Sequence, residues 1–412
     1  MTSRYIEKLH VENVRKFDVL DMTFEPGFNF IAGPNGCGKT SVLACIAHCF
    51  DPSSLSYSTV SEASTFWVDM SDGSEKLRVG FGKNSASGGY RKGAFKPSGQ
   101  SFPSEEGRRS IKGYDGRVDF LCPLFIGANR NIKYKEIPGV ARELPTGDAA
   151  KLYKNNGLKS LHGDWSGDIK QWLINRYFII DKPWAAIERE NFNRFVNALE
   201  GIGPRGSNFK FVEVGRDLEP VFSIYNRKCY LEELSAGFQA VFTIVVMIFE
   251  WMEKTQEQNR LADTVTGTVL IDELDLHLHP EWQFTLRDSL RGLFPKLQFI
   301  VTTHSPHLLA SARENEVIIM PANSIGGVIS SSSQRYSGWS TDQILTDVMD
   351  VRSLNNKDHE RLISIALTEA ENGNLPGLET AIENLEAISH PSDTIVTVLK
   401  VKQASLVALK DD

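Results

Sequence analysis

Residues 30–43 read FIAGPNGCGKTSVL and fit the pattern G-x-x-x-x-G-K-[ST]. Such a loop needs glycines because its backbone N–H groups must turn inward around phosphates, where a Cβ atom would block the approach. Phe28, Phe30 and Ile31 predict a short buried strand before the loop, and residues 40–50 have the apolar spacing of a helix. A strand, a glycine loop and a helix in this order predict a site for a nucleoside triphosphate.

The polar positions of the loop have separate expected roles. We expect Lys39 to contact the β and γ phosphates and the Thr40 hydroxyl to bind Mg²⁺. The predicted nucleotide-binding residues of this stretch are Gly33, Pro34, Asn35, Gly36, Gly38, Lys39, Thr40 and Ser41. The alternative is a glycine turn between two core elements.

A second motif, VLIDE at residues 269–273, is an apolar run that ends in two carboxylates. It predicts a buried parallel strand that delivers its last residues to the carboxyl edge of an α/β sheet, where ligands bind. We expect Asp272 to hold Mg²⁺ through water and Glu273 to act as the general base on the attacking water. The alternative is a strand that ends in solvated acids.

Two further motifs accompany these. The apolar run at residues 298–303 is followed by His304, which can contact the γ-phosphate and the attacking water, and by Ser305-Pro306, which fits the start of a helix. Residues 234–239 read LSAGFQ and precede an apolar helix predicted from Ala240 to Met252. A small-residue turn that opens a helix presents free N–H groups to an anion. The chain already has one phosphate loop, so this second anion site would have no ligand unless another nucleotide reaches it.

The four motifs occur in the order found in ABC-type ATPase heads of the SMC-like superfamily, which the chain resembles over about its first 80 residues and over residues 209–312. In that family they are Walker A, signature, Walker B and the switch histidine. More narrowly, DELDLHLHP at residues 272–280 and THSP at residues 303–306 resemble prokaryotic ATPases of the overcoming-lysogenization-defect type and the ATPase subunits of Septu and retron defence systems. Ala236 and Phe238 depart from the usual signature, since a polar or acidic residue is common at the position of Phe238.

The resemblance implies an α/β fold: an ABC-type ATPase head, with a P-loop mixed sheet and an antiparallel layer, that carries a short helical insert and a helical C-terminal tail. It implies Mg²⁺-dependent hydrolysis of ATP to ADP and phosphate, with Glu273 and His304 as catalytic residues and Thr40 and Asp272 on the metal. Ser235 and Gly237 would meet the nucleotide held by a second subunit. The implied partners are a second copy, in a homodimer or higher oligomer joined by sandwiched ATP, a separate HNH-type nuclease and, for a retron, a reverse transcriptase or nucleic acid.

Along the chain we expect an N-terminal lobe at 1–145, a helical insert at 146–208, a C-terminal lobe at 209–335 and a helical region at 336–412. Residues 65–81 alternate in polarity and predict a hairpin of the antiparallel layer. Residues 82–116 are rich in Gly, Ser and Pro and predict a mobile surface loop. That loop carries aromatic and basic residues, which either contact nucleic acid or a partner or belong to a solvated insertion: Lys83, Tyr90, Arg91, Lys92, Phe95, Lys96, Arg108, Arg109 and Lys112.

Three other stretches carry expectations. Residues 118–126 predict a buried strand, after which Arg130 either reaches the nucleotide pocket or is an ordinary strand-end arginine. The insert is too short for a long coiled coil, so a compact helical lid is expected. Apolar stripes in the tail, such as Leu378, Ile382 and Leu385, are expected to pack on the head, with a partner dock as the alternative. No glutamine for a Mg²⁺-sensing loop can be identified.

Composition narrows the class of protein. The net charge of −7 over 412 residues argues against attraction of nucleic acid to the whole surface. Five unclustered cysteines fit a reduced cytoplasm, and His277 and His279 are expected to shape a dimer-facing turn rather than bind metal. No membrane contact is expected, because the longest apolar stretch, Ala240–Trp251, falls short of the ~20 residues of a membrane span and no signal peptide precedes it.

A TOPRIM nuclease, which related ATPases carry, needs a glutamate and an Asp-x-Asp set, and no Asp-x-Asp follows His304. We therefore expect the ATPase subunit of an antiphage defence complex, which holds or regulates a separate effector nuclease. One alternative is a RecF/SMC-like ATPase of DNA repair or recombination. The other is a nucleotide-gated binding module with little turnover.

Overall fold

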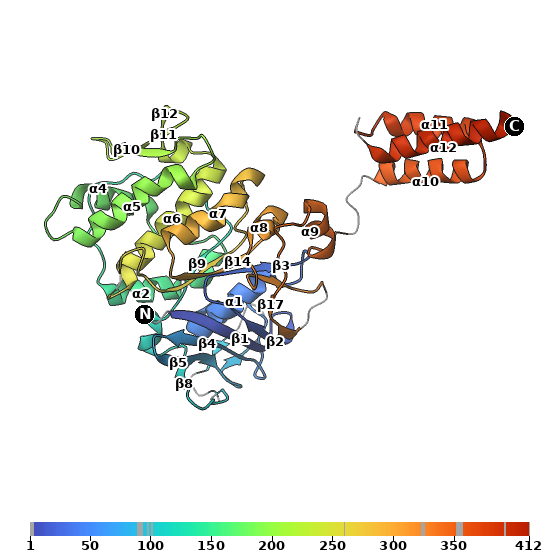
Figure 1. The fold of residues 1–412 in the computed structure, drawn as a ribbon. Coiled ribbons are helices and arrows are strands. Elements are labelled where there is room, and N and C mark those ends of the chain that lie inside the picture. The colour runs from blue at the N-terminus through green and yellow to red at the C-terminus, as the bar shows by residue number, and fades with distance from the viewer. Residues whose placement is uncertain are drawn as a thin grey trace. The chain divides into compact units, whose positions relative to one another are not determined.

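Two six-stranded sheets face one another across a layer that contains helix α1 (Figure 1). The computed structural model describes residues 4–88, 94–96, 99, 102–258, 260–322, 326–351, 357–390 and 393–411. The chain divides into two units, Met1–Asp350 and Val351–Asp412. Both sheets belong to the first unit.

The first sheet has the strand order β17-β15-β3-β14-β13-β9 and is parallel except for β17. Its strands are β3 (Phe28–Ala32), β9 (Leu124–Ile126), β13 (Gly267–Ile271), β14 (Leu297–Thr302), β15 (Val317–Ile319) and β17 (Ser331–Ser332). Strands β3, β13 and β14 are buried along their whole length, as parallel strands covered on both faces must be. Because the three strands run in the same direction, the residues that follow them meet at one edge of the sheet.

The second sheet has the order β16-β2-β1-β4-β5-β8. Its strands are β1 (Arg4–Val14), β2 (Phe17–Thr23), β4 (Thr65–Asp72), β5 (Glu75–Phe81), β8 (Arg109–Lys112) and β16 (Gly326–Ile329). The pairs β1–β2, β1–β4 and β4–β5 are antiparallel, which confirms the predicted hairpin at residues 65–81. The two edge strands pair in parallel, β16 with β2 and β8 with β5.

Helix α1 (Lys39–Phe50) fills the space between the sheets and buries ten of its twelve residues. Thr40 and Ser41, in the first turn of α1, are the two residues that are not buried. This turn lies at the same edge of the parallel sheet as the carboxyl ends of β13 and β14. Cys45 and Cys49 on this helix are fully buried, as expected of small core residues. All five cysteines of the chain are free.

Further helices of the first unit follow α1 along the chain. They are α2 (Thr146–Asn155), α3 (Gly157–Leu161), α4 (Ile169–Ile179), α5 (Ala186–Ile202), α6 (Ala236–Thr255), α7 (Pro280–Leu293), α8 (Pro306–Ser311) and α9 (Thr341–Asp347). A small sheet of β10 (Lys210–Val214), β11 (Pro220–Ile224) and β12 (Arg227–Tyr230) packs beside α4 and α5. The α/β fold predicted from the sequence is thereby confirmed, with its mixed sheet, antiparallel layer, helical insert and helical tail.

Helix α6 is longer than the sequence predicted. Its 20 residues reach the length and hydropathy of a membrane span, so the expectation that no apolar stretch approaches that length is wrong. Of the apolar stretch of this helix, 94% is buried inside the protein. The helix gains length because the signature residues form its first turn and Glu253-Lys254-Thr255 its last.

The predicted strand at residues 118–126 is mostly wrong. Asp115 caps a 3-10 turn, η2 (Gly116–Phe120), by accepting a hydrogen bond from the N–H of Arg117, and only Leu124–Ile126 pair with β13. Pro123, just before the strand, has no backbone N–H that could donate a hydrogen bond to a neighbouring strand. Two further 3-10 turns are η1 (Pro52–Tyr57) and η3 (Leu231–Glu233).

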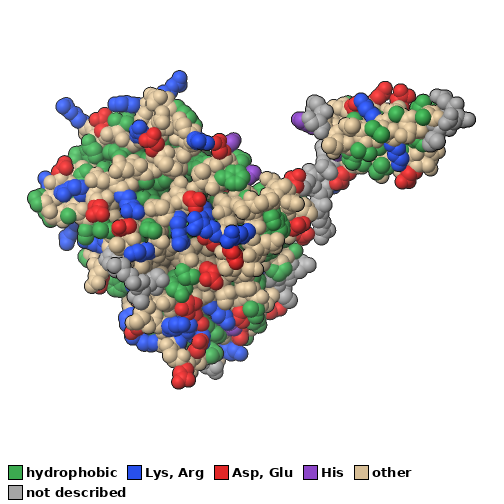
Figure 2. All heavy atoms as spheres, viewed as in Figure 1, with side chains coloured by type: hydrophobic (Ala, Val, Ile, Leu, Met, Phe, Trp, Pro, Cys, Tyr) green, Lys and Arg blue, Asp and Glu red, His purple; other side chains and the backbone are tan. Residues whose placement is uncertain are grey.

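The predicted mobile loop at residues 82–116 contains regular structure. It includes the short pair β6 (Ala86–Ser87) and β7 (Ala94–Phe95) and the edge strand β8. Several of its cations are paired with acids: Arg108 with Glu7 of β1 at 2.7 Å, Arg109 with Glu75 of β5 at 3.5 Å and Lys96 with Glu62, before β4, at 2.8 Å. Basic and acidic side chains are accordingly interspersed at this end of the molecule (Figure 2). The predicted contacts of Tyr90, Arg91 and Lys92 lie outside the described residues.

The second unit consists of α10 (Lys357–Glu371), α11 (Leu375–Glu386) and α12 (Thr394–Asp411). Leu378, Ile382 and Leu385 of α11 are buried against Ala366 and Leu399 of the two neighbouring helices. The expectation that these stripes pack on the head is wrong, because three amphipathic helices close a core among themselves. Helix α9 lies in the first unit, so the predicted region 336–412 is divided between the two units.

The buried histidine on α1 makes stability depend on pH. The ring nitrogens of His48 lie 2.6 Å from Ser54 Oγ and 2.7 Å from Ser58 Oγ, and burial, with Arg15 nearby, lowers the pKa of His48 to about 3. The unfolded chain binds this proton near the ordinary pKa of 6.5, whereas the folded chain does not, so the free energy of unfolding falls as pH drops below 6.5. At pH 5.5 this loss is about 1.4 kcal/mol.

We therefore expect the stability gap between wild type and His48→Gln to shrink by about 1.4 kcal/mol from pH 7.5 to pH 5.5. Urea unfolding at the two pH values measures it. The matched control is His277→Asn at an exposed histidine, whose gap to wild type should stay constant. An equally constant gap for His48→Gln would contradict the assignment.

Candidate nucleotide-binding site

The loop between β3 and α1 has a backbone that only glycine adopts without strain. Gly33 has φ of 140° and Gly38 has φ of 108°, both in the left-handed region. A Cβ atom on Gly33 would lie 2.4 Å from the carbonyl oxygen of Met320. Pro34, Asn35 and Gly36 form the outer rim of this loop, and Ser41 is half-buried on the first turn of α1. The loop thus fits a phosphate cradle at the start of a twelve-residue helix.

Two lysines donate hydrogen bonds to carbonyl oxygens of the loop. Lys39 is 6% exposed, and its Nζ donates to the carbonyl oxygens of Gly33 at 2.9 Å and Pro34 at 3.0 Å. Burial lowers the pKa of Lys39. Lys16, in the turn between β1 and β2, donates to the carbonyl oxygens of Gly36 at 2.9 Å and Cys37 at 2.8 Å. Sequence reasoning missed Lys16, because nothing in the local pattern places that turn beside the loop.

The two predicted metal ligands lie together. Thr40 Oγ1 is 3.0 Å from both carboxylate oxygens of Asp272, and Thr302 Oγ1 donates to Asp272 Oδ1 at 2.6 Å. Asp272 is buried, and its N–H donates to the carbonyl oxygen of Ile126 at 2.9 Å. A hydroxyl and a carboxylate are the oxygen ligands that Mg²⁺ uses beside substrate phosphates. The donor set therefore fits this ion.

Glu273 follows at the end of β13 in a fixed conformation. Its φ of 50° is left-handed, and its N–H donates to Thr302 Oγ1 at 2.8 Å. Leu274 N–H donates to the carbonyl oxygen of Thr302 at 3.0 Å. Thr302 therefore holds both Walker B acids, and Glu273 remains half-buried at the edge of the sheet.

The histidine after β14 lies beside the same edge. Asp275 Oδ1 accepts hydrogen bonds from Thr303 Oγ1 at 2.6 Å and from the N–H of His304 at 3.2 Å. Burial, together with the charge of Lys39, lowers the pKa of His304 below its ordinary value, so the imidazole is neutral at pH 7. Ser305 caps α8 through the N–H groups of His307 and Leu308, both at 3.1 Å, so the two roles expected of this motif are compatible.

The signature turn lies at the start of α6. Ser235 is the N-cap residue of this helix, is exposed, and makes no side-chain cap hydrogen bond there. Gly237 is buried, and a Cβ atom on it would lie 2.8 Å from the carbonyl oxygen of His277. Phe238 points inward and packs on Phe209 and Trp282, with ring centroids 5.0 and 5.1 Å apart. The unusual residue of this signature is therefore a core residue, and the exposed turn presents Ser235.

An arginine joins Walker B to the segment after β9. Arg130 is buried and donates to the carbonyl oxygens of Glu273, at 2.9 Å, and Asp272. Arg130 thus reaches the backbone of the two Walker B acids, and its contact with a bound nucleotide stays a prediction. Burial lowers its pKa to about 10, so the guanidinium remains charged at pH 7.

Of the two histidines in the turn after Walker B, His279 has a capping role. His279 Nδ1 accepts the N–H of Glu281 and caps α7, while His277 is exposed with φ of 66°. Over the described ranges of the chain, no group of three His, Cys, Asp or Glu side chains is arranged to hold a metal ion.

Comparisons with known proteins agree with this geometry. Residues 180–310 match a family model described as "AAA domain, putative AbiEii toxin, Type IV TA system", and residues 8–118 match one described as "AAA domain". Each model covers less than half of the chain. Between them they include all four motifs.

The chain is 27% identical to the Septu protein PtuA of Bacillus thuringiensis over 97% of this chain and 98% of that protein. It is 31% identical to the Retron Ec83 probable ATPase of Escherichia coli over 34% of this chain and 24% of that protein. Among solved structures, the SMC head domain from Thermotoga maritima aligns over 80% of this chain and 99% of that chain, at 15% identity and a TM-score of 0.44. The resemblance to Septu and retron ATPases expected from the motifs is confirmed.

The inward position of Phe238 leads to a test of stability. Replacing a buried phenylalanine by alanine costs about 3 kcal/mol or more, because apolar contact is lost and a cavity remains. We expect Phe238→Ala to lower the free energy of unfolding by that amount in urea titrations.

The matched control is Phe284→Ala, because Phe284 is 45% exposed on α7. Its loss should stay below about 1 kcal/mol. Equal losses for the two variants would mean that Phe238 is not part of the core.

Proposed function

We propose that this chain binds and hydrolyses ATP with Mg²⁺ and serves as the ATPase subunit of a prokaryotic antiphage defence complex. The observation that carries the proposal is the cluster at one edge of the parallel sheet, where Thr40 meets Asp272 at 3.0 Å beside Glu273. The similarity to a Septu protein over 97% of the chain supports the defence assignment.

Binding follows from the loop. The backbone N–H groups of Gly33 and of residues 35–41, which lead into α1, would surround the phosphates, and Lys39 adds a buried positive charge. Thr40 and Asp272 would hold Mg²⁺, which offsets phosphate charge when bound. Thr302 keeps the Asp272 carboxylate turned toward Thr40, since it donates to Oδ1 from the neighbouring strand.

Hydrolysis requires a base and an oriented water. Glu273 is placed by Thr302 and Arg130 at the end of its strand, where its carboxylate can accept a proton from water. The neutral imidazole of His304 can hydrogen-bond the same water or the γ-phosphate. Burial lowers the pKa of this imidazole and so favours its neutral form.

The signature turn then supplies the second half of a site in another copy. The exposed Ser235 and the backbone of the buried Gly237, at the N-terminus of α6, would meet the γ-phosphate bound to the loop of a second subunit. A dimer of this kind is stabilised while the γ-phosphate is present and opens after hydrolysis. A separate effector, an HNH-type nuclease or, in a retron, a reverse transcriptase with its nucleic acid, would respond to this closed-to-open change.

Two variants separate binding from hydrolysis. Glu273→Gln should bind ATP without cleaving it and accumulate as a dimer, whereas Lys39→Ala should remain monomeric because the γ-phosphate is not held. Size-exclusion chromatography with light scattering in MgATP measures the dimer fraction. Glu281→Gln, an exposed glutamate on α7, is the control and should behave like wild type. Equal dimer content in Glu273→Gln and Lys39→Ala would contradict the proposal that ATP is held between two copies of the chain.

The partner can be found by purifying the tagged protein after expression with its native neighbouring genes. We expect a nuclease or reverse transcriptase to copurify in fixed stoichiometry. A lone dimer whose ATP turnover rises with DNA would favour a RecF/SMC-like repair ATPase instead. Nucleotide-dependent dimers with negligible turnover would favour a nucleotide-gated binding module.

A further inference from the structure

Arg130 touches Walker B without touching the phosphate loop. Its side chain is 3% exposed, its Nε donates to the carbonyl oxygen of Gly127 at 2.9 Å, and its Nη2 donates to the carbonyl oxygens of Asp272 and Glu273. Within the described part of the chain, Nη1 makes no hydrogen bond. The buried guanidinium thus bonds the backbone of Asp272, the predicted Mg²⁺ ligand, and of Glu273, the predicted general base.

The contact between Arg130 and Glu273 restrains an uncommon backbone conformation at Glu273. Glu273 has φ of 50°, which a residue with a side chain adopts only under constraint. Thr302 fixes the N–H of Glu273 and Arg130 fixes its carbonyl, so both peptide groups of this residue are restrained. The direction of the Glu273 side chain therefore depends on where Arg130 lies.

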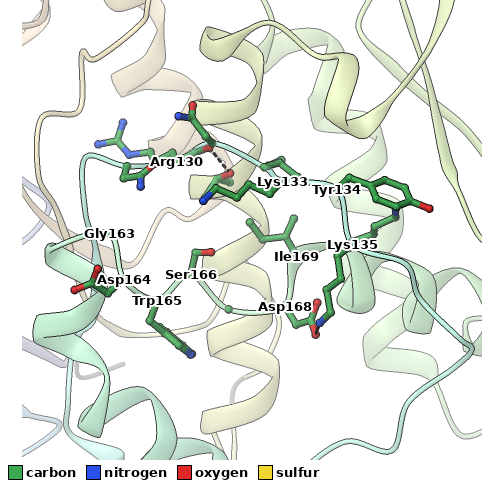
Figure 3. Close-up of a pocket in the computed structure, with 16 residues that line it drawn as sticks. Arg130, Lys133, Tyr134, Lys135, Gly163, Asp164, Trp165, Ser166, Asp168 and Ile169 are labelled. Carbon is green, nitrogen blue, oxygen red and sulfur yellow. Dashed lines mark hydrogen bonds and ion pairs between the residues drawn. The ribbon is translucent and has the colours of Figure 1, made fainter.

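The main chain around Arg130 is tied to the signature. Ile132 N–H donates to Gln239 Oε1 at 2.9 Å, and Gln239 Nε2 donates to the carbonyl oxygens of Glu232 and Leu234, both at 3.0 Å. Thr243 Oγ1, one turn further along α6, donates to the carbonyl oxygen of Arg130 at 3.3 Å. Figure 3 shows this hydrogen bond, with the Arg130 guanidinium turned away from Ser166 and Ile169.

We propose that the strap, residues 127–132, couples the signature turn to Glu273, with Arg130 as a positioning residue for hydrolysis. The inference rests on the proposed ATPase function and adds a role for residues outside the four motifs. When the turn closes on a partner's nucleotide, a shift of Leu234 moves Gln239 and Ile132, and the guanidinium carries that shift to the backbone of Glu273. Hydrolysis at one site thereby depends on engagement of the same subunit's signature at the other.

A double-substitution cycle tests the coupling. Arg130→Lys keeps the charge but loses the planar fork that reaches three carbonyls, and Gln239→Met keeps the shape but loses all three amide hydrogen bonds. We expect each variant to lower kcat about tenfold or more with KM for ATP within about threefold, since binding groups are untouched. The kcat of the double variant should lie at most about threefold below that of the slower single variant, because both substitutions break the same connection. Lys133→Ala, an exposed neighbour of the strap, is the matched control and should keep wild-type kcat.

The outcomes separate the inference from the function on which it rests. If wild type turns over ATP and the two losses in kcat multiply, or if KM rises with kcat unchanged, the strap is not a coupling element. Wild type without turnover would overturn the proposed hydrolysis and the inference together. If Arg130→Lys fails to fold by urea unfolding, Gln239→Met and Thr243→Val test the strap from its other end. A reduced kcat at constant KM then supports the strap, and wild-type kinetics overturn it.

Discussion

The carboxylate of Asp272 is the point at which three parts of the first unit are joined. It accepts hydrogen bonds from Thr40 on α1 and from Thr302 on β14, while its own N–H reaches the end of β9. Because β3, β13 and β14 run parallel, their carboxyl ends arrive at one edge, and the glycine loop can fold over that edge. Loss of this register would separate the phosphate loop from its acids, even if every motif were kept.

Residues with a role in local chemistry could be predicted from the sequence, because the motifs fix both spacing and flanking elements. The VLIDE run specifies a buried strand with acids at its end, and the glycine pattern specifies a turn before a helix. Lys16 and Arg130 could not be assigned in this way. Each bonds to backbone carbonyls contributed by a distant segment, and such contacts leave no periodic pattern.

Errors in the fold prediction have similar causes. Strand β8 has four residues and follows a Gly- and Ser-rich stretch, so the propensity signal is weaker than the sheet pairing that fixes it. The apolar stripes of the tail were assigned correctly to helices, but a stripe carries no information on whether it faces the head or a sister helix. Phe238 stands where the signature of related ATPases commonly has a polar or acidic residue, and the pattern alone does not show that this side chain packs in an aromatic cluster with Phe209 and Trp282.

Helices α10, α11 and α12 form a core from their own apolar side chains. Leu378, Ile382 and Leu385 of α11 meet Ala366 of α10 and Leu399 of α12 in this core. In evolutionary terms, an unfavourable substitution in this core can be compensated by a second substitution within the same three helices.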